Sequence, residues 1–265
     1  MQRHYLNVAH RGASAHAPEN TLLAFERAIE LGADMSELDL HLSRDGALVV
    51  MHDASVDHTT DGHGAIRDLS LAELKRLDAG QGQRVPTLPE VIDLVRGRSG
   101  LYLELTAQGT PRATVDCLRA RAPTTAKSAP SWEPANGFTG RRVPTRDPGR
   151  AWVPRQQVIV GSFDAALARE AKALAPEIAT SLLVDPVYPA QTLIDLARSA
   201  HTDYLHLCWE NRAPHPHELL TPELLRALRA AGLGIVLWHE ERDDELRVLR
   251  TLDVDAICTN TPEKL

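Results

Sequence analysis

Residues 8–53 of the chain read VAHRGASAHAPENTLLAFERAIELGADMSELDLHLSRDGALVVMHD. His10 and Arg11 follow a short apolar run and precede Gly12, an arrangement typical of a strand that ends in a tight loop. An imidazole and a guanidinium therefore lie next to each other at the end of a predicted strand. The apolar residues of segment 22–31 then recur with the spacing of one helix face, which predicts a helix that ends at Gly32.

The next segment, Met35–Leu42, alternates between polar and leucine positions from residue 37 onward. Glu37, Asp39 and His41 fall on one face of the predicted strand, and the leucines fall on the other. Alternating acids are most often a solvated strand face. Here the opposite face is wholly apolar, so two carboxylates and an imidazole are expected to share one polar face.

Asp45 and Gly46 predict a two-residue hairpin turn between this strand and a second strand that ends near His52. Such a turn pairs residue 44 with residue 47 and therefore places Asp39 directly opposite His52. A lone histidine is usually a surface or hydrogen-bonded residue. The coincidence of two acids and two histidines at strand ends favours a functional site instead.

The composition of the 265 residues is that of a globular protein, with 43% hydrophobic and 25% charged residues. The length suits one α/β barrel or two small domains. A formal charge of -7 argues against a nucleic-acid or anionic-membrane partner held by bulk electrostatics. No apolar run reaches the roughly 18 residues expected of a membrane span.

Three cysteines, Cys117, Cys208 and Cys258, are odd in number and lack metal-ligand spacing. A disulfide framework is therefore not expected. The first ten residues, MQRHYLNVAH, enter a strand without a charged leader or a cleavage site. These features predict a reducing, cytoplasmic location.

Short apolar strands alternate with helices over the second half of the chain, and this order predicts a parallel sheet. The expected strands are 101–105, 158–162, 179–183, 204–208, 234–238 and 256–259, and the expected helices are 111–121, 165–174, 191–198, 222–231 and 244–252. With the first three strands the total is nine, one more than a (β/α)8 TIM barrel uses. We therefore expect a single α/β barrel domain over residues 1–265, with one hairpin strand outside the barrel and a small helical insertion over residues 54–98.

A barrel of this kind carries its active site at the carboxyl ends of its strands. His10, Glu104, Ser162 and Trp238 all lie at or near such ends. The expected site is therefore at this end of the barrel.

Residues 122–157 interrupt the alternation of strands and helices. The segment carries six prolines and six Lys or Arg residues against two acids, which predicts a long irregular loop. A surface linker is one interpretation. The other is a basic flap over the site, suggested by Arg141, Arg142, Arg146, Arg150 and Arg155.

Glu104 ends the apolar strand LYLEL, and a buried acid is costly unless it is paired or bound to a cation. Together with Glu37 and Asp39 it would form a site of three carboxylates without a thiolate. Such ligands suit Mg²⁺ or Ca²⁺ rather than zinc. A divalent ion there would offset the charge of a phosphodiester during attack.

The remaining groups also suit a phosphodiester substrate. Arg11 can bind two phosphate oxygens at once. Cleavage requires one group that removes a proton from the nucleophile and one that protonates the departing alkoxide. Imidazole, with a pKa of about 6.5, can perform either step near neutrality. We expect His10 and His52 to fill these two roles, in an order that the sequence leaves open.

These residues lie in motifs that resemble the glycerophosphodiester phosphodiesterase family. The motifs cover most of the chain outside residues 122–157. They are AHRGASAHAPENT (9–21), SELDLHLSRDGALVVMHD (36–53), HTTDGHG (58–64), DLSLAELKRLDAG (68–80), VPTLPEV (85–91), LYLELT (101–106), VIVGSFD (158–164) and VDAICTNTPEKL (254–265).

The resemblance implies a (β/α)8 barrel that hydrolyses glycerophosphodiesters to sn-glycerol 3-phosphate and an alcohol, assisted by Mg²⁺ or Ca²⁺. By motif position, His10 and His52 correspond to the catalytic histidines and Arg11 to the phosphate-binding arginine. Glu37, Asp39 and Glu104 correspond to the metal ligands.

Two positions depart from the family pattern. Thr106 stands where the family usually has a lysine, so a phosphate contact is missing or supplied elsewhere. Trp238 is followed by His239, Glu240 and Glu241, where the family tends to have Trp-Thr-Val-Asn. Trp238 can stack on the glycerol of the substrate or belong to the core, and the alcohol side of the substrate stays open.

Two other functions compete with this one. A lipid-cleaving enzyme of the lysophospholipase D or sphingomyelinase D kind needs an apolar rim, for which Trp132, Phe138 and Trp152 are candidates. A non-catalytic phosphate-binding barrel is suggested by Thr106. The presence of both His10 and His52 argues against mere binding, because binding does not need a pair of proton-transfer groups.

Overall fold

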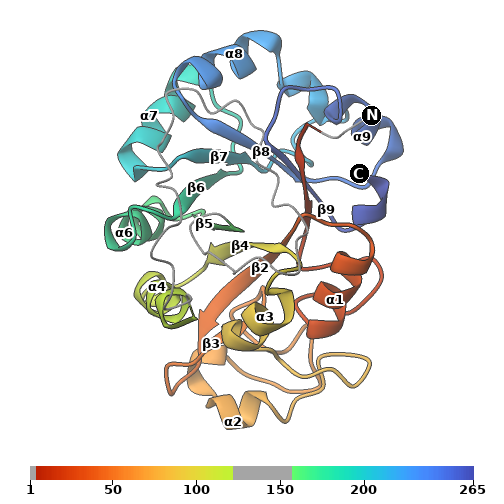
Figure 1. The fold of residues 1–265 in the computed structure, drawn as a ribbon, viewed down its shortest axis with the longest axis vertical. Coiled ribbons are helices and arrows are strands. Elements are labelled where there is room, and N and C mark those ends of the chain that lie inside the picture. The colour runs from red at the N-terminus through yellow and green to blue at the C-terminus, as the bar shows by residue number, and fades with distance from the viewer. Residues whose placement is uncertain (1–3, 122–156) are drawn as a thin grey trace.

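The structure is a computed structural model that describes residues 4–121 and 157–265, and these form one barrel (Figure 1). The six strands expected after residue 100 are observed within one residue at each end. The nine strands are β1 (Leu6–Ala9), β2 (Met35–Leu42), β3 (Leu48–Val50), β4 (Gly100–Leu105), β5 (Val158–Ser162), β6 (Ala179–Val184), β7 (Tyr204–Leu207), β8 (Gly234–His239) and β9 (Ala256–Thr259).

Eight of these strands form a closed parallel barrel. The sheet order is β1-β9-β8-β7-β6-β5-β4-β2-β3, and a parallel pairing of β1 with β2 closes the ring. β3 pairs antiparallel with β2 and lies outside the barrel. The predicted (β/α)8 barrel and the exclusion of one hairpin strand are therefore confirmed.

Helices surround the strands on the outside (Figure 1). None of the helices within residues 4–121 and 157–265 is long and apolar enough to cross a membrane. The α-helices are α1 (Leu22–Glu30), α2 (Leu71–Leu74), α3 (Leu88–Val95), α4 (Thr110–Arg121), α6 (Ala165–Leu174), α7 (Ala190–Ala200), α8 (Pro222–Ala230) and α9 (Asp243–Leu249), with short 3₁₀ turns η1 (Ile66–Asp68), η2 (Pro216–Leu219) and η3 (Pro262–Lys264).

The starts of several helices follow from local chemistry. The side chains of Thr21, Asp164 and Thr221 each accept a hydrogen bond from a backbone N–H of the first turn of α1, α6 and α8. Ser70 and Thr87 form complete capping boxes at α2 and α3. The residue that precedes α9 is Arg242, whose side chain makes no capping hydrogen bond.

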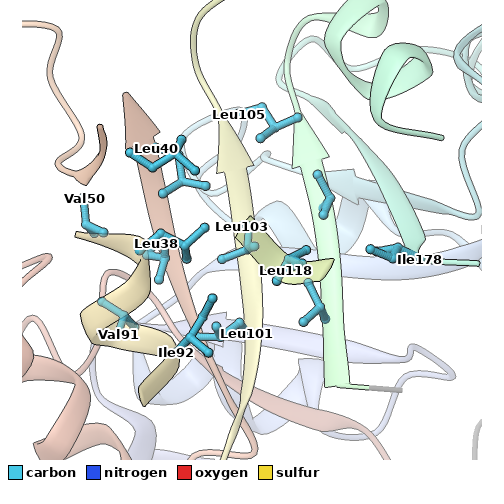
Figure 2. Packing of buried hydrophobic residues seen from close by; sticks show 14 of the residues in the cluster. Leu38, Leu40, Val50, Val91, Ile92, Leu101, Leu103, Leu105, Leu118 and Ile178 are labelled. Carbon is cyan, nitrogen blue, oxygen red and sulfur yellow. The ribbon is translucent and has the colours of Figure 1, made fainter. Parts of the chain in front are cut away.

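The leucines of β2 and β4 belong to one of two large hydrophobic clusters between barrel and helices. In Figure 2, Leu38 of β2 and Leu103 of β4 lie between the strands and the covering helices, near Ile92 of α3 and Leu118 of α4. The alternate positions, including Glu37 and Glu104, therefore face the interior of the barrel. This division explains why one face of β2 is wholly apolar although its other face carries acids.

The register of the early hairpin differs by one residue from the expected one. Leu42 pairs with Leu48, and Met51 N–H donates to the carbonyl oxygen of Asp39, so Met51 rather than His52 is opposite Asp39. The cause is a longer turn, in which Ser43 N–H donates to Ala47 O and Ser43 Oγ accepts from Ala47 N–H. The prediction of a two-residue turn at Asp45 and Gly46 is therefore wrong.

The segment expected as an insertion contains two structural parts. A small core lies under η1 and α2 and includes Val56, Ile66, Leu74 and Val85. α3, which falls within the expected range 54–98, packs with α1 and contributes to the hydrophobic cluster that contains the leucines of β2 and β4. The excursion from the barrel thus ends before α3 begins at residue 88.

Candidate active site

Three carboxylates meet inside the barrel at neighbouring strands. Glu37 and Asp39 share a face of β2, and Asp39 pairs in register with Glu104 on β4. One oxygen atom from each of the three lies within 4.8 Å of those from the other two. Glu37 and Asp39 are buried, and Glu104 is partly buried. The parallel pairing of β2 with β4 therefore brings together the three acids that the sequence predicts as metal ligands.

The burial of these acids opposes their ionisation. The pKa of Glu37 is raised well above its usual value, first by burial and then by the neighbouring charges of Asp39 and Glu104. Burial and the charge of Asp39 raise the pKa of Glu104 to about 8. A cluster of this kind must bind protons or a cation near neutrality.

The donor set fits a hard divalent cation. All three ligands are carboxylate oxygens, which Mg²⁺ and Ca²⁺ prefer, and no thiolate belongs to the cluster. A bound cation would also stabilise the ionised form of these buried carboxylates, which have little positive charge around them. The three residues are therefore suitable ligands for the ion expected from the sequence.

Raising the pH should destabilise the metal-free protein, because the raised pKa of Glu104 means that the folded state binds a proton which the unfolded state releases. This stabilisation is complete below about 4.5 and is lost as the pH rises through about 8. We expect a loss of at least about 1 kcal/mol between pH 5 and pH 9, which corresponds to about 2–4 °C in Tm. Thermal unfolding of EDTA-treated protein measures it.

The matched control for this prediction is Glu104→Gln, whose side chain does not titrate. Its Tm should fall less with rising pH than the Tm of the wild type. Saturating Mg²⁺ should also reduce the fall in the Tm of the wild type with pH. Equal slopes in the variant and the wild type would show that Glu104 does not hold the proton.

Arg11 belongs to the loop between β1 and α1 and contacts the carboxylate cluster. Its backbone N–H donates to Glu37 Oε2 at 2.9 Å, and its guanidinium Nη1 donates to Glu19 at 3.0 Å. Its Nε lies 3.7 Å from Asp39 Oδ2, and Asn20 Nδ2 donates to the same oxygen at 2.8 Å. Glu19 and Asn20 thereby fix the positions of Arg11 and Asp39.

The backbone of this loop is strained at the same residues. Arg11 and Asn20 have φ values of 54° and 56°, in the left-handed region that non-glycine residues seldom occupy. Such strain persists where the surroundings enforce it, and it concentrates at functional sites. Here the enforcing contacts include the hydrogen bond from Asn20 N–H to the carbonyl oxygen of Arg11.

Gly12→Ala should unfold the protein more easily and misplace Arg11. Gly12 has a φ of 79°, and a Cβ at this position would lie 2.7 Å from the backbone carbon of Ala24. The left-handed conformation costs an alanine about 1–2 kcal/mol and the clash adds about 1–3 kcal/mol. We expect a loss of about 2–5 kcal/mol in the free energy of unfolding measured with urea. Gly46→Ala is the control, because it has the same φ and open space around its Cβ.

His10 follows β1 and is held by two polar neighbours. Its Nδ1 lies 2.7 Å from Oδ1 of Asn260, and Ser14 Oγ donates to the same oxygen at 2.7 Å. Because the amide oxygen only accepts, the ring proton is on Nδ1, and Nε2 carries the lone pair. Nε2 lies 4.0 Å from Glu37 Oε2. Burial, and after it the charges of His239 and Arg11, lower the pKa of His10 well below its usual value.

His52 lies in the loop after β3 with 43% of its side chain exposed. Its Nδ1 is 2.8 Å from Oδ1 of Asp53, and this hydrogen bond lowers the pKa of the Asp53 carboxyl. Its carbonyl oxygen is 3.0 Å from Nε2 of His41, which faces the barrel interior. The expected cross-strand contact with Asp39 is replaced by this arrangement, in which a carboxylate beside His52 orients its ring.

A bulge at the end of β8 reverses the sides of the sheet that Trp238 and His239 would face under strict alternation. A register shift between Leu237 and His239 pairs His239 with Cys258 and leaves Trp238 unpaired. Trp238 is 1% exposed and packs in the core between barrel and helices. The ring of His239 instead lies 4.4 Å from that of His10. The bulge therefore supports the interpretation of Trp238 as a core residue and brings His239 to the site.

Comparison with known proteins identifies the family of this chain. The model of the glycerophosphoryl diester phosphodiesterase family matches residues 10–264. The chain belongs to this family. A glycerophosphodiester phosphodiesterase of Caldanaerobacter subterraneus subsp. tengcongensis is 32% identical over 98% of this chain and 96% of the relative. Membership confirms the expected enzyme class, a phosphoric diester hydrolase.

Two solved structures have the same fold. A phosphodiesterase of Oleispira antarctica in complex with its product sn-glycerol-3-phosphate has a TM-score of 0.76 and 28% identity, with coverage of 97% of this chain and 93% of that structure. A glycerophosphodiester phosphodiesterase of Agrobacterium tumefaciens has a TM-score of 0.75 and 27% identity, with coverage of 98% of both chains.

Thr106, which departs from the family pattern, serves the scaffold. Its Oγ1 donates to the carbonyl oxygen of Leu40 at 2.6 Å and lies 3.1 Å from Nδ1 of His41. His41 in turn contacts the backbone of His52. A threonine here orients neighbouring residues but brings no positive charge to a phosphate.

Several candidates lie outside the described residues. These are the apolar Trp132, Phe138 and Trp152 and the basic Arg141, Arg142, Arg146, Arg150 and Arg155. Their interpretations as an acyl-chain rim and a basic flap remain predictions.

Sequence reasoning missed residues that hold the site together. Asn20 directly precedes Thr21, whose side chain caps α1, and the Asn20 amide donates to Asp39 instead. Asn260 stands in the closing motif without a periodic pattern to mark it, and only the pairing of β1 with β9 brings it to His10. The only sequence signal for Asn20 is that it and Thr21 are two consecutive residues of types that can cap a helix.

Proposed function

We propose that this chain hydrolyses glycerophosphodiesters to sn-glycerol 3-phosphate and an alcohol with a divalent cation, Mg²⁺ or Ca²⁺. The observation that carries the proposal is the cluster of Glu37, Asp39 and Glu104 beside His10 and Arg11. The product in the complex of the Oleispira antarctica relative supports the same substrate class.

Glu37, Asp39 and Glu104 would hold the cation, which supplies positive charge to the phosphoryl oxygens when it is bound. Arg11 would bind a phosphate oxygen with its free N–H groups. Glu19 accepts from Nη1 of Arg11 and so keeps the guanidinium fixed at this place. The pentavalent phosphate formed during attack carries more negative charge than the ester, so fixed positive groups favour it.

His10 would act as the general base. Its ring proton is directed at Asn260, so the Nε2 lone pair can accept a proton from the attacking water. The low pKa of His10 keeps the ring neutral, as a base requires. Ser14 supports the orientation through its hydrogen bond to the same amide oxygen.

His52 would act as the general acid. The Asp53 carboxylate lies 2.8 Å from its Nδ1 and holds the ring so that Nε2 is free to face the leaving group. Nε2 can then donate its proton to the departing alkoxide. The exposure of the His52 side chain suits this role, since the alcohol leaves toward solvent.

Incubation with glycerophosphocholine and glycerophosphoethanolamine, with Mg²⁺, with Ca²⁺ and with EDTA, tests the proposal. We expect release of glycerol 3-phosphate that EDTA abolishes and that either ion restores. Binding of these esters without turnover under all conditions would support a non-catalytic phosphate-binding barrel instead.

A lysophospholipase D-like activity is a second candidate, because one specific feature favours it. Among the described residues, Phe163, Val187 and Tyr188 are exposed large apolar side chains in the loops after β5 and β6. These neighbouring loops lie at the same end of the barrel as the site. An apolar rim there could contact the acyl chain of a lysolipid.

Replacing Phe163 and Tyr188 with serine distinguishes the lysolipid activity from hydrolysis of glycerophosphodiesters. If lysophosphatidylcholine is a substrate, F163S/Y188S should lower its kcat/KM by at least about tenfold, because burying an aromatic side chain contributes about 1.5–3 kcal/mol. L23S, at an exposed apolar position on α1, is the control. No turnover of the lysolipid by the wild type would exclude the second candidate.

We also propose that the reaction takes place in the reducing cytoplasm. The chain has an odd number of cysteines, and Cys117, Cys208 and Cys258 are free thiols in the structure. Fractionation of the host cell with an antibody against the chain would test this location.

A further inference from the structure

A second cluster of metal-ligand side chains lies away from the three carboxylates. His215 and His217 belong to the loop between β7 and α8, on either side of Pro216, and Glu245 is in the first turn of α9. One nitrogen of each histidine and one oxygen of Glu245 lie within 4.8 Å of one another. None of the family motifs quoted above contains His215, His217 or Glu245.

The contacts within the cluster converge on one carboxylate. Nδ1 of His215 is 3.2 Å from Glu245 Oε1, and Nδ1 of His217 is 2.9 Å from the same oxygen. The backbone N–H of His217 donates to the other oxygen, Oε2, at 3.1 Å. Oε1 therefore lies 3.2 and 2.9 Å from the two imidazole nitrogens, close to the roughly 3.3–3.6 Å that separates ligands of a tetrahedral ion with bonds about 2.0–2.2 Å long.

Glu245 is also poorly compensated for a buried acid. Its side chain is 1% exposed, and within the described parts of the chain no Lys or Arg nitrogen lies within 4.0 Å of its carboxylate. Arg242 is the nearby cation, but its guanidinium is bonded to Glu240. A buried carboxylate faced by two histidines is stable when the rings donate protons to it or when an ion lies between them.

We propose that His215, His217 and Glu245 bind a first-row transition ion of the zinc class. Two imidazole nitrogens and one carboxylate oxygen suit Zn²⁺, whereas the all-oxygen cluster at the active site suits Mg²⁺ or Ca²⁺. The side chain of His215 is 56% exposed, so water can supply the fourth ligand. Pro216 restricts the backbone between the two histidines, which reduces the entropy lost on binding.

An ion at this place would join the loop after β7 to the start of α9. These segments are far apart in sequence and meet through η2, which packs against α9. The loop follows the carboxyl end of a barrel strand, the end that carries the active site. The site would therefore fix one loop of the catalytic face without taking part in the reaction.

Zinc titration in a background that lacks one active-site ligand tests the proposal. In the Glu104→Gln variant of the full chain, calorimetry with Zn²⁺ should show one bound ion at this cluster. His217→Asn keeps a donor to Glu245 but loses the imidazole. It should weaken zinc binding by at least about 10²-fold, since even the partners of metal ligands contribute about 10- to 100-fold. Zinc at a hundredfold excess over its Kd should raise the Tm of this background by about 5–10 °C.

Two further variants test whether a loss of zinc binding is specific to this cluster. His215→Ala changes a mostly exposed side chain, so it should fold even if the His217 variant does not, and it should also abolish most of the increase in Tm. His16→Ala removes an exposed histidine that lies 2.8 Å from Glu263 without a second imidazole, and zinc binding should stay unchanged. The proposal would be overturned if the H215A and H217N derivatives bound zinc as tightly as the Glu104→Gln background. The increase in Tm with zinc would then also be equal in all three proteins.

Discussion

Asp39→Asn should lower the turnover of glycerophosphocholine by at least about 10³-fold. The substitution keeps the size of the side chain but removes one of three negative charges that we propose as ligands for the cation. It also changes the acceptor that Asn20 Nδ2 and Arg11 approach. Loss of the ion costs several kcal/mol of transition-state stabilisation, and about 4 kcal/mol corresponds to 10³ in rate.

The measurements for this variant separate catalysis from folding. Steady-state kinetics at saturating Mg²⁺ gives the loss in turnover, calorimetry gives the loss in metal affinity, and circular dichroism checks the fold. Asp34→Asn is the matched control, because Asp34 directly precedes β2 at the opposite end of the barrel. It should change turnover less than about threefold. An Asp39 variant with turnover within tenfold of wild type would show that Asp39 does not hold the ion.

His10→Ala and His52→Ala should each lower turnover by at least about 10²-fold with the fold intact. A positioned general acid or base contributes about 10²- to 10⁴-fold. His201→Asn is the control, since His201 ends α7 near the amino end of β7, away from the site. A loss below tenfold for either alanine variant would defeat the assignment of that histidine to proton transfer.

The leaving group distinguishes the acid from the base. A 4-nitrophenyl phosphodiester releases an anion that needs no proton, so His52→Ala should be impaired much less with this substrate than with glycerophosphocholine. His10→Ala should be equally impaired with both, because its proposed role is at the nucleophile. The reverse result would exchange the two assignments.

Much of the fold could be predicted because its strands and helices carry local signals. Strands 158–162 and 256–259 and the helix 165–174 are observed with the predicted bounds, since short apolar runs, capping residues and helical spacing mark them directly. The excess of one strand over eight was also informative. It indicated that a hairpin strand lies outside the barrel, as β3 does.

The predicted side of the sheet for a side chain is wrong where a turn or bulge shifts the strand by one residue. The turn after β2 is longer than two residues, and therefore Met51 rather than His52 lies opposite Asp39. The bulge in β8 directs Trp238 to the core and His239 to His10. Because successive strand residues face opposite sides, a shift of one position reverses inside and outside, and this shift is set by contacts with other strands.

By itself, the sequence determined that Glu37 and Asp39 share a face, because alternation is a property of a single strand. It also determined the order of strands and helices, and its motifs indicated the family. The position of Glu104 at a strand end also indicated that it joins the two acids, and the pairing of β2 with β4 sets it in register with Asp39. The tertiary structure alone decided that Asn20 and Asn260 orient Asp39 and His10 and that His239 faces the site. These contacts depend on pairing between strands distant in sequence and on bulges and turns whose cost is balanced by packing elsewhere, which no local pattern encodes.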